Sequence, residues 1–221
     1  MKEAELEKVV RMAPREPGPA ATDVPISVVP ANEASWEHVQ LVVGKARCHA
    51  ALCFCQRFKI AESSWRAVTD EERAHRLRKE TDCGHPASAT TSGLLAYIGD
   101  EPVGWCSVAR RTAYPYIPDA RIAWKKRGED KDDDSVWAVA CFVTRTEFRR
   151  RGVMRGLAAA AVGFARERGA RALEGYAMIT EPGKEITWGE LHVGSRSVFA
   201  AAGFREVARP TLRRVVMRLD F

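Results

Sequence analysis

Apolar positions near the start of the chain recur at helical spacing in two segments. The first runs from Trp36 to Val43, between Ser35, a common helix-capping residue, and Gly44, which favours a stop. The second opens with the capping-box pattern Thr69 to Glu72 and continues toward Cys83. The spacing therefore predicts two helices in the first part of the chain.

The period changes after Gly93, where short apolar runs replace helical spacing. Leu94 to Ile98 and Val103 to Val108 are separated by the turn-forming sequence Gly99 to Pro102, a pattern that predicts a hairpin. After a long connection, Val136 to Val143 is a nearly continuous apolar and β-prone run. Such a run is typical of a buried central strand.

The last part of the chain alternates helices and strands. The pattern predicts a helix from Val153 to Gly169, a strand from Ala172 to Ile179, a helix from Ser195 to Ala202 and a strand from Leu212 to Leu219. We therefore expect an α/β (α+β) fold with a mixed, mostly antiparallel central sheet flanked by helices.

Prolines mark the boundary of the domain. The segment from Pro14 to Pro30 contains five of them, among few large apolar residues. We expect residues 1–23 to form an N-terminal tail and residues 24–221 to form a single domain.

The charge is moderately basic but scattered. The chain has 35 basic and 29 acidic residues, a net charge of +6 and a pI near 9.1. It has no apolar run long enough to cross a bilayer and no export signal, so we expect a cytoplasmic protein without a membrane partner. The densest basic cluster, Arg149 to Arg151 with Arg155, is too compact to follow a nucleic acid backbone but suits one polyphosphate.

The position of this cluster gives it a chemical meaning. It links the predicted buried strand to the start of an amphipathic helix, where unpaired backbone N–H groups and the helix dipole attract anions. Gly152 permits close approach of the backbone to a ligand. The loop is therefore a candidate pyrophosphate site.

The same segment resembles the signature of the GNAT superfamily of N-acetyltransferases: Arg or Gln, two residues, Gly, one residue, then Gly or Ala. Here Arg149 and Gly152 match, and Met154 departs from the small residue usual at the last position. The predicted hairpin, the strand ending Cys141 to Thr144 and the late segment Ser197 to Phe204 are similar to the family's elements in the same order.

The resemblance implies that acetyl-CoA is the acyl donor and that an amine of a small molecule or peptide attacks its thioester directly. Backbone N–H groups of Phe142 to Thr144 would polarise the thioester carbonyl. Homodimers are common among relatives. The resemblance assigns acetyl-CoA binding to Phe142, Val143, Thr144, Arg149, Arg150, Arg151, Gly152, Val153, Met154, Arg155 and Phe199.

The general acid and base are less defined. Many relatives place a tyrosine in the final helix, and the matching residue here is Phe199, which has no proton to give. Glu190 and His192 are the candidate catalytic residues by chemistry and location, ahead of Ser195 and Tyr176. A second class of function therefore stays open, a catalytically quiet acyl-CoA-binding sensor or interaction module.

Two further clusters have a chemical and a structural interpretation. Cysteines and histidines between Cys48 and His85 are zinc-ligand types, but their spacing matches no familiar zinc site, and we predict no metal. A zinc-dependent nucleic-acid binder therefore ranks last. Cys48 to Phe58 is either part of the acceptor pocket or ordinary packing. The acidic run Glu129 to Asp134 either attracts a cationic acceptor or is a solvated loop.

Overall fold

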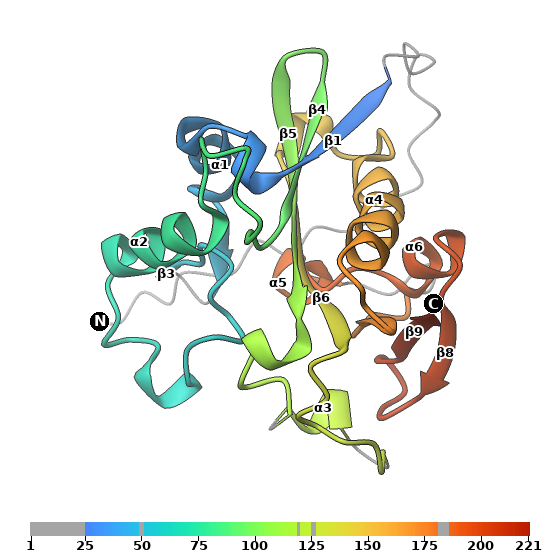
Figure 1. Ribbon diagram of the computed structural model, residues 1–221. Helices are drawn as coiled ribbons and strands as arrows, with labels where there is room; N and C mark the ends of the chain where they lie inside the picture. The colour runs from blue at the N-terminus through green and yellow to red at the C-terminus, as the bar shows by residue number, and fades with distance from the viewer. Residues whose placement is uncertain (1–24, 49–50, 119, 125–126, 181–185) are drawn as a thin grey trace.

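The computed structural model describes residues 25–48, 51–118, 120–124, 127–180 and 186–221, and its main feature is a seven-stranded sheet (Figure 1). The strands are β1 Ile26–Pro30, β2 Arg47–Cys48, β3 Ala51–Leu52, β4 Leu94–Ile98, β5 Glu101–Arg110, β6 Val136–Thr144, β7 Ala172–Gly175, β8 Arg205–Ala208 and β9 Val216–Asp220. The α-helices are α1 Trp36–Val43, α2 Asp70–Thr81, α3 Arg121–Trp124, α4 Val153–Glu167, α5 Trp188–Leu191 and α6 Arg196–Ala201. Short 3-10 helices are η1 Ala31–Glu33, η2 Glu62–Ser64, η3 Arg111–Ala113 and η4 Thr146–Phe148.

The order of the main sheet is β1-β4-β5-β6-β7-β9-β8, and β2 and β3 form a separate two-stranded sheet. Within the main sheet, β6 and β7 run parallel, and each other neighbouring pair is antiparallel. This confirms the expected mixed, mostly antiparallel sheet.

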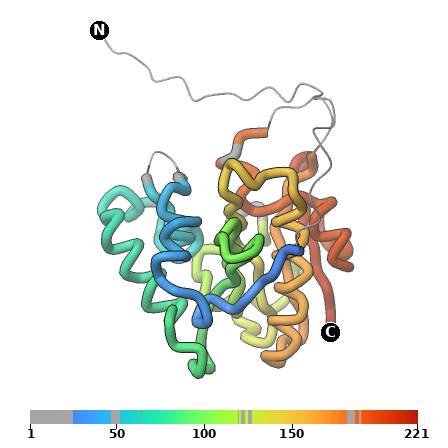
Figure 2. Tube along the Cα trace, turned by 90° about the horizontal axis from the view of Figure 1, so that it is seen from above, coloured from blue at the N-terminus to red at the C-terminus, as the bar shows by residue number. Residues whose placement is uncertain are grey.

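Helices cover both faces of the sheet, and alternating residues of the central strands divide the core between them. Cys106 and Phe142 pack on the side of α4, whereas their chain neighbours Trp105 and Cys141 pack on the side of α1 and α2. Figure 2 shows α1 and α2 on one side of the strands and α4 and α6 on the other. The continuous apolar run of β6 is explained by burial on both faces.

Helix α4 lies unusually close to β5 at Gly104. A Cβ atom at this position would lie 2.4 Å from Cγ1 of Val153 and 3.1 Å from Cδ1 of Leu157. Val153 is the first residue of α4, so this close approach also positions the basic loop that precedes the helix.

We predict that Gly104→Ala lowers the free energy of unfolding by about 1–3 kcal/mol, because the added methyl group overpacks this contact. Urea denaturation monitored by circular dichroism measures the change. The control is Gly163→Ala in α4, the helix that packs on Gly104, because a Cβ at Gly163 would meet nothing within 4 Å. That variant should be neutral or slightly more stable; equal effects at the two positions would contradict the packing argument.

Most predicted elements are confirmed, and the predicted caps Ser35 and Thr69 are present, together with a further cap at Ser195. The side chains of Ser35, Thr69 and Ser195 accept N–H groups in the first turns of α1, α2 and α6. Among the described residues, no helix is long and apolar enough to cross a membrane. The predicted tail, residues 1–23, lies outside the described residues.

Two predicted strands are shorter than expected, and four strands were not predicted: the short pair β2 and β3, and two edge strands of the main sheet. The predicted strand from Ala172 ends at Gly175, because the chain then leaves β6 and makes only isolated bridges at Met178. The predicted strand from Leu212 begins at Val216 instead. Two edge strands, β1 and β8, were missed because proline flanks the first and charged residues dominate the second.

Candidate functional site

The two parallel strands of the sheet separate partway along their length. Val136 to Val139 of β6 pair with Ala172 to Gly175 of β7, and the pairing stops there, although β6 continues to Thr144. A bulge at this point, where Ala140 is the extra residue against β5, bends β6 further. The result is a gap beside the second half of β6, at the end that leads into the basic loop.

A later segment of the chain enters the first part of this gap. The backbone N–H of Phe142 donates to the carbonyl of His192 at 2.6 Å. On the other side, Met178 N–H donates to the carbonyl of Gly194 at 2.9 Å, and Arg196 N–H donates to the carbonyl of Met178 at 2.8 Å. The segment from His192 to Arg196 therefore bridges the separated strands. The amide of Phe142 already donates a hydrogen bond to this segment, so it is not available to a ligand.

Strand alternation determines where the neighbouring amides point. Arg145 N–H donates to the carbonyl of Val103 at 3.0 Å, so Arg145 faces the β5 side. Because backbone N–H groups alternate in direction along a strand, the amide of Val143 points toward β5 as well, whereas the amide of Thr144 points toward the gap. Of the three amides expected to polarise a thioester, that of Thr144 has the suitable direction.

The loop after β6 holds two residues in the left-handed region, Arg150 with φ 66° and Gly152 with φ 83°. A non-glycine residue in this conformation is strained, and such strain concentrates at ligand sites. Gly152 is the N-cap of α4, and no side chain caps this helix. The first intrahelical bond is from Gly156 N–H to the carbonyl of Gly152, so the amides of the first turn precede the hydrogen-bonded part of the helix.

The predicted phosphate-binding side chains surround this helix start. Arg150, Arg151 and Arg155 are exposed, and Arg149 is half-buried. Burial lowers the pKa of Arg149, partly offset by the charge of Glu147. Met154 is half-buried against the core on the α4 side.

A small cavity of about 150 Å³ adjoins the loop, between the end of α1 and the end of β6. Its lining includes two predicted residues of the strand, Val143 and Thr144, together with Arg149. Two further cations, Lys45 and Arg145, also line it, although Arg145 is paired with Glu147 at 2.7 Å. The strand and the basic loop thus contribute to one concave surface.

Phe199, in the place of the usual tyrosine, lies in the core. Its side chain is 0% exposed and packs with Phe142 and Phe204 at ring-centroid distances of 5.8 and 5.0 Å. Phe199 therefore packs against Phe142 within the core. Its predicted contact with acetyl-CoA stays a prediction.

Glu190 is engaged in structural bonds. It forms a capping box with Thr187 at the start of α5 and an ion pair with Arg213 at 3.2 Å. The backbone N–H of Thr187, followed by the charge of Arg213, lowers the pKa of Glu190 despite some burial. A carboxylate held ionised in this way is a poor proton acceptor.

His192 is the predicted catalytic residue that lies directly beside β6. Its Nδ1 is 2.6 Å from the carbonyl oxygen of Gly189, which can only accept, so Nδ1 carries the proton. In the neutral imidazole, Nε2 is then the basic nitrogen. This tautomer suits a general base.

The two less favoured candidates have other partners. Ser195 caps α6, and its hydroxyl lies 3.0 Å from that of Ser197. Tyr176 is buried and donates to Glu174 at 3.2 Å, and burial raises its pKa well above the usual value. Its hydroxyl therefore stays protonated within the core.

Sequence reasoning missed the buried ion network that Tyr176 joins. Glu174 accepts from Arg111, Arg127 and Arg218, and all four side chains are largely buried. The available signals were a glutamate in the middle of the predicted strand from Ala172 and an arginine within the predicted final strand.

The cysteine-containing segment packs closely in the described part. Cys53 to Gln56 is buried, and Phe54 and Cys55 both have positive φ. The Gln56 amide donates to Glu80 at 3.0 Å. Across the described residues there is no group of three possible metal ligands. These contacts agree with the packing interpretation of the segment, whereas an acceptor role stays a prediction.

Comparison with known proteins agrees with this architecture. The model of the acetyltransferase (GNAT) family matches residues 56–180. A solved structure described as an acetyltransferase is 18% identical, with a TM-score of 0.52, and the match covers 88% of this chain and 98% of that one.

Two further structures contain ligands. PaiA N-acetyltransferase from Thermoplasma acidophilum with coenzyme A is 11% identical, with a TM-score of 0.49, and the match covers 89% of this chain and 99% of that one. The structure of yncA from Salmonella typhimurium with its cofactor acetyl-CoA is 12% identical, with a TM-score of 0.49, and the match covers 88% of this chain and 93% of that one. A search of curated protein sequences found no match. Because the family model spans more than half of the chain, the protein belongs to the GNAT acetyltransferase family.

Proposed function

We propose that the protein is an N-acetyltransferase that moves the acetyl group of acetyl-CoA to a primary amine of a small molecule or a protein. The observation that carries this proposal is the basic, uncapped start of α4 beside the gap between β6 and β7. The start of α4 would bind the anionic part of acetyl-CoA, and the gap would hold its extended thioester arm.

The residues fit the donor in two ways. The amides at the start of α4 and the exposed side chains of Arg150, Arg151 and Arg155 suit a pyrophosphate. The amide of Thr144 faces the gap, where it can donate to a carbonyl oxygen.

The proposed reaction is a direct attack. The amine nitrogen bonds to the thioester carbonyl carbon, the carbon–sulfur bond breaks, the amine loses a proton and the thiolate gains one. A lysine-like amine is mostly protonated at neutral pH, so a general base assists the attack. The bond from Nδ1 to Gly189 leaves Nε2 of His192 as the nitrogen for that role.

We predict that His192→Gln lowers kcat about 100-fold and leaves CoA affinity nearly unchanged, because a glutamine amide cannot accept a proton at neutral pH. The matched variant is Glu190→Gln. Glu190 lies in α5, the helix that ends just before His192, three positions after its N-cap Thr187. Its kcat should change by less than about threefold, since the glutamine can preserve much of the cap. Free thiol release measures both, and an equal loss in the two variants would remove His192 from the proposed role.

The test of the function is release of free CoA from acetyl-CoA across a panel of polyamines, aminoglycosides and lysine peptides. Acceptor-dependent release, with the acetylated amine identified by mass spectrometry, supports the proposal and names the acceptor class. Tight CoA binding without release across the panel contradicts it.

A catalytically quiet acyl-CoA sensor is the second candidate, and the buried Phe199 is the observation that favours it. Because phenylalanine cannot protonate a thiolate, this position supplies no general acid. The acceptor panel distinguishes the two functions: tight CoA binding without release of free CoA for any acceptor would support the sensor.

A further inference from the structure

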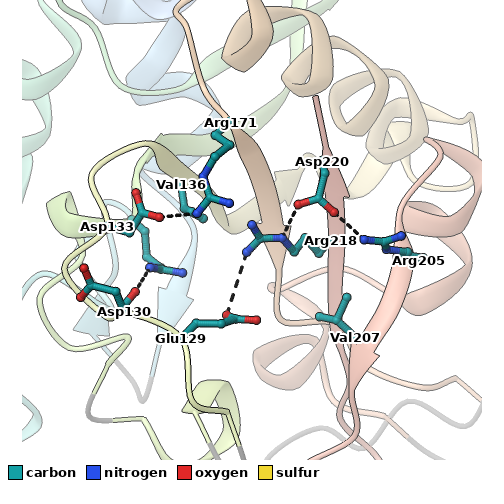
Figure 3. A pocket seen from close by; sticks show the side chains of 10 residues that line it. Glu129, Asp130, Asp133, Val136, Arg171, Arg205, Val207, Arg218 and Asp220 are labelled. Carbon is teal, nitrogen blue, oxygen red and sulfur yellow. Dashed lines mark hydrogen bonds and ion pairs between the residues drawn. The ribbon is translucent and has the colours of Figure 1, made fainter.

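A second and larger cavity, of about 360 Å³, lies at the opposite end of the central strand from the basic loop (Figure 3). Val136, the first residue of β6, lines it, whereas the basic loop follows the last residue of that strand. The lining is almost entirely charged: Arg111, Glu129, Asp130, Asp133, Val136, Arg171, Arg205, Val207, Arg218 and Asp220.

Beneath this cavity, buried positive charge exceeds buried negative charge. The side chains of Arg111, Arg127 and Arg218 are 1%, 3% and 9% exposed, and all three pair with Glu174, which is 0% exposed. Three guanidinium groups thus share one fully buried carboxylate. Within the described residues, the positive charge that remains is balanced from the solvent side, where Glu129 pairs with Arg127 and Asp220 pairs with Arg218.

Arg111 is the least satisfied of these cations. Its contact with Glu174 is 3.4 Å, longer than that of Arg218 at 2.7 Å. Its Nε is buried without a hydrogen-bond partner among the described residues, as is the Nε of Arg127, but of these two arginines Arg111 is the one that lines the cavity. A buried N–H without an acceptor is destabilising, so a ligand oxygen at this position would be stabilised.

Three of the four carboxylates of the lining, those of Glu129, Asp133 and Asp220, are paired with arginines, as Figure 3 shows. Asp133 pairs with Arg171, and its bonds with Ser135 and Arg171 lower its pKa to about 2. Asp220 forms ion pairs with Arg205 at 2.6 Å and with Arg218 at 2.7 Å. Since each guanidinium has five N–H donors, arginines paired in this way retain donors for a further acceptor.

We propose that this cavity is a second ligand site, which binds the carboxylate or phosphate group of a small molecule independently of the acyl-CoA site. The oxyanion lies over Arg111 and Arg218, with Arg171 and Arg205 at the rim. The site rests on the cavity and on the excess of buried arginines over buried carboxylates beneath it, and it does not depend on the proposed transferase activity.

Calorimetric titration at constant ionic strength tests this proposal, with inorganic phosphate and citrate as separate probes. The full chain is used in the Arg150→Glu, Arg151→Glu background, so that anions bound at the basic loop do not contribute. We expect saturable binding of at least one probe, weakened about tenfold by Arg171→Gln or Arg205→Gln through loss of a charge-assisted bond. The preferred probe distinguishes a carboxylate from a phosphate ligand.

Arg209→Gln is the control, because Arg209 pairs with Glu206 at 2.8 Å and does not line the cavity. It should bind the probe like the parent protein, and melting temperatures verify that each variant folds. Absence of saturable binding in the parent, binding that Arg209→Gln weakens as much as Arg205→Gln does, or binding of spermidine in place of the anions would overturn the proposal.

Discussion

Gly152→Glu is expected to weaken CoA binding by at least about 100-fold, equivalent to roughly 2.7 kcal/mol. The new carboxylate lies at the N-terminus of α4, where it takes the place of the anion and repels the pyrophosphate. Isothermal titration of CoA into wild type and variant measures the loss.

Backbone strain has to be separated from this electrostatic effect. Gly152 has φ 83°, so any side chain there costs roughly 1–2 kcal/mol in stability. Gly203→Glu is the matched control, because Gly203 has φ 91° and lies after α6, away from the basic loop. The control should lose similar stability and retain CoA affinity. If Gly152→Glu binds CoA as well as the control does, the proposed pyrophosphate site is wrong.

Glu174→Gln is expected to lower the free energy of unfolding by about 3–5 kcal/mol, because it leaves buried arginines without their shared carboxylate. The side chains of Arg111 and Arg127 are 1% and 3% exposed, so water cannot replace the lost partner. Denaturant titration at pH 7 measures the change. In the control Glu206→Gln, which removes exposed pairs with Arg209 and Arg196, the loss should stay below about 1 kcal/mol.

The same network predicts a pH dependence with a definite sign. Burial by itself raises the pKa of Glu174, but the bond with Arg127 and the charges of Arg127, Arg111 and Arg218 lower it overall from 4.5. A lowered pKa contributes stability above about pH 4.5 that is lost as the pH falls through the folded-state pKa. The difference between wild type and Glu174→Gln should therefore narrow below pH 4.5, and a difference that widens would contradict the network.

Local signals were sufficient for most of the architecture. Ser35, Thr69 and Ser195 are helix caps by residue type, and the apolar run of β6 identifies a buried strand. The end of β7 was not predictable, because residues beyond Gly175 remain apolar and only tertiary contacts separate them from β6. Edge strands such as β8 carry charges, so their pattern resembles that of a loop.

The candidate site shows a similar division between local and long-range information. The basic loop and Gly152 could be predicted as a candidate site from the sequence, because a short motif that resembles the family signature carries the chemistry. The hydrogen bond from Phe142 to the carbonyl of His192 joins residues fifty positions apart, and no local pattern encodes it. For the same reason, the convergence of Arg111, Arg127 and Arg218 on Glu174 emerges only from the fold.

Amide hydrogen exchange with and without CoA tests the central claim most directly. Proton exchange at each amide reports whether the ligand lies against it or stabilises it. Bound CoA should slow exchange at Arg150 to Arg155 and at Thr144, and leave the charged cavity near Val136 unchanged. If CoA slows exchange elsewhere and leaves the start of α4 unaffected, the acyl-CoA site is not where this account places it.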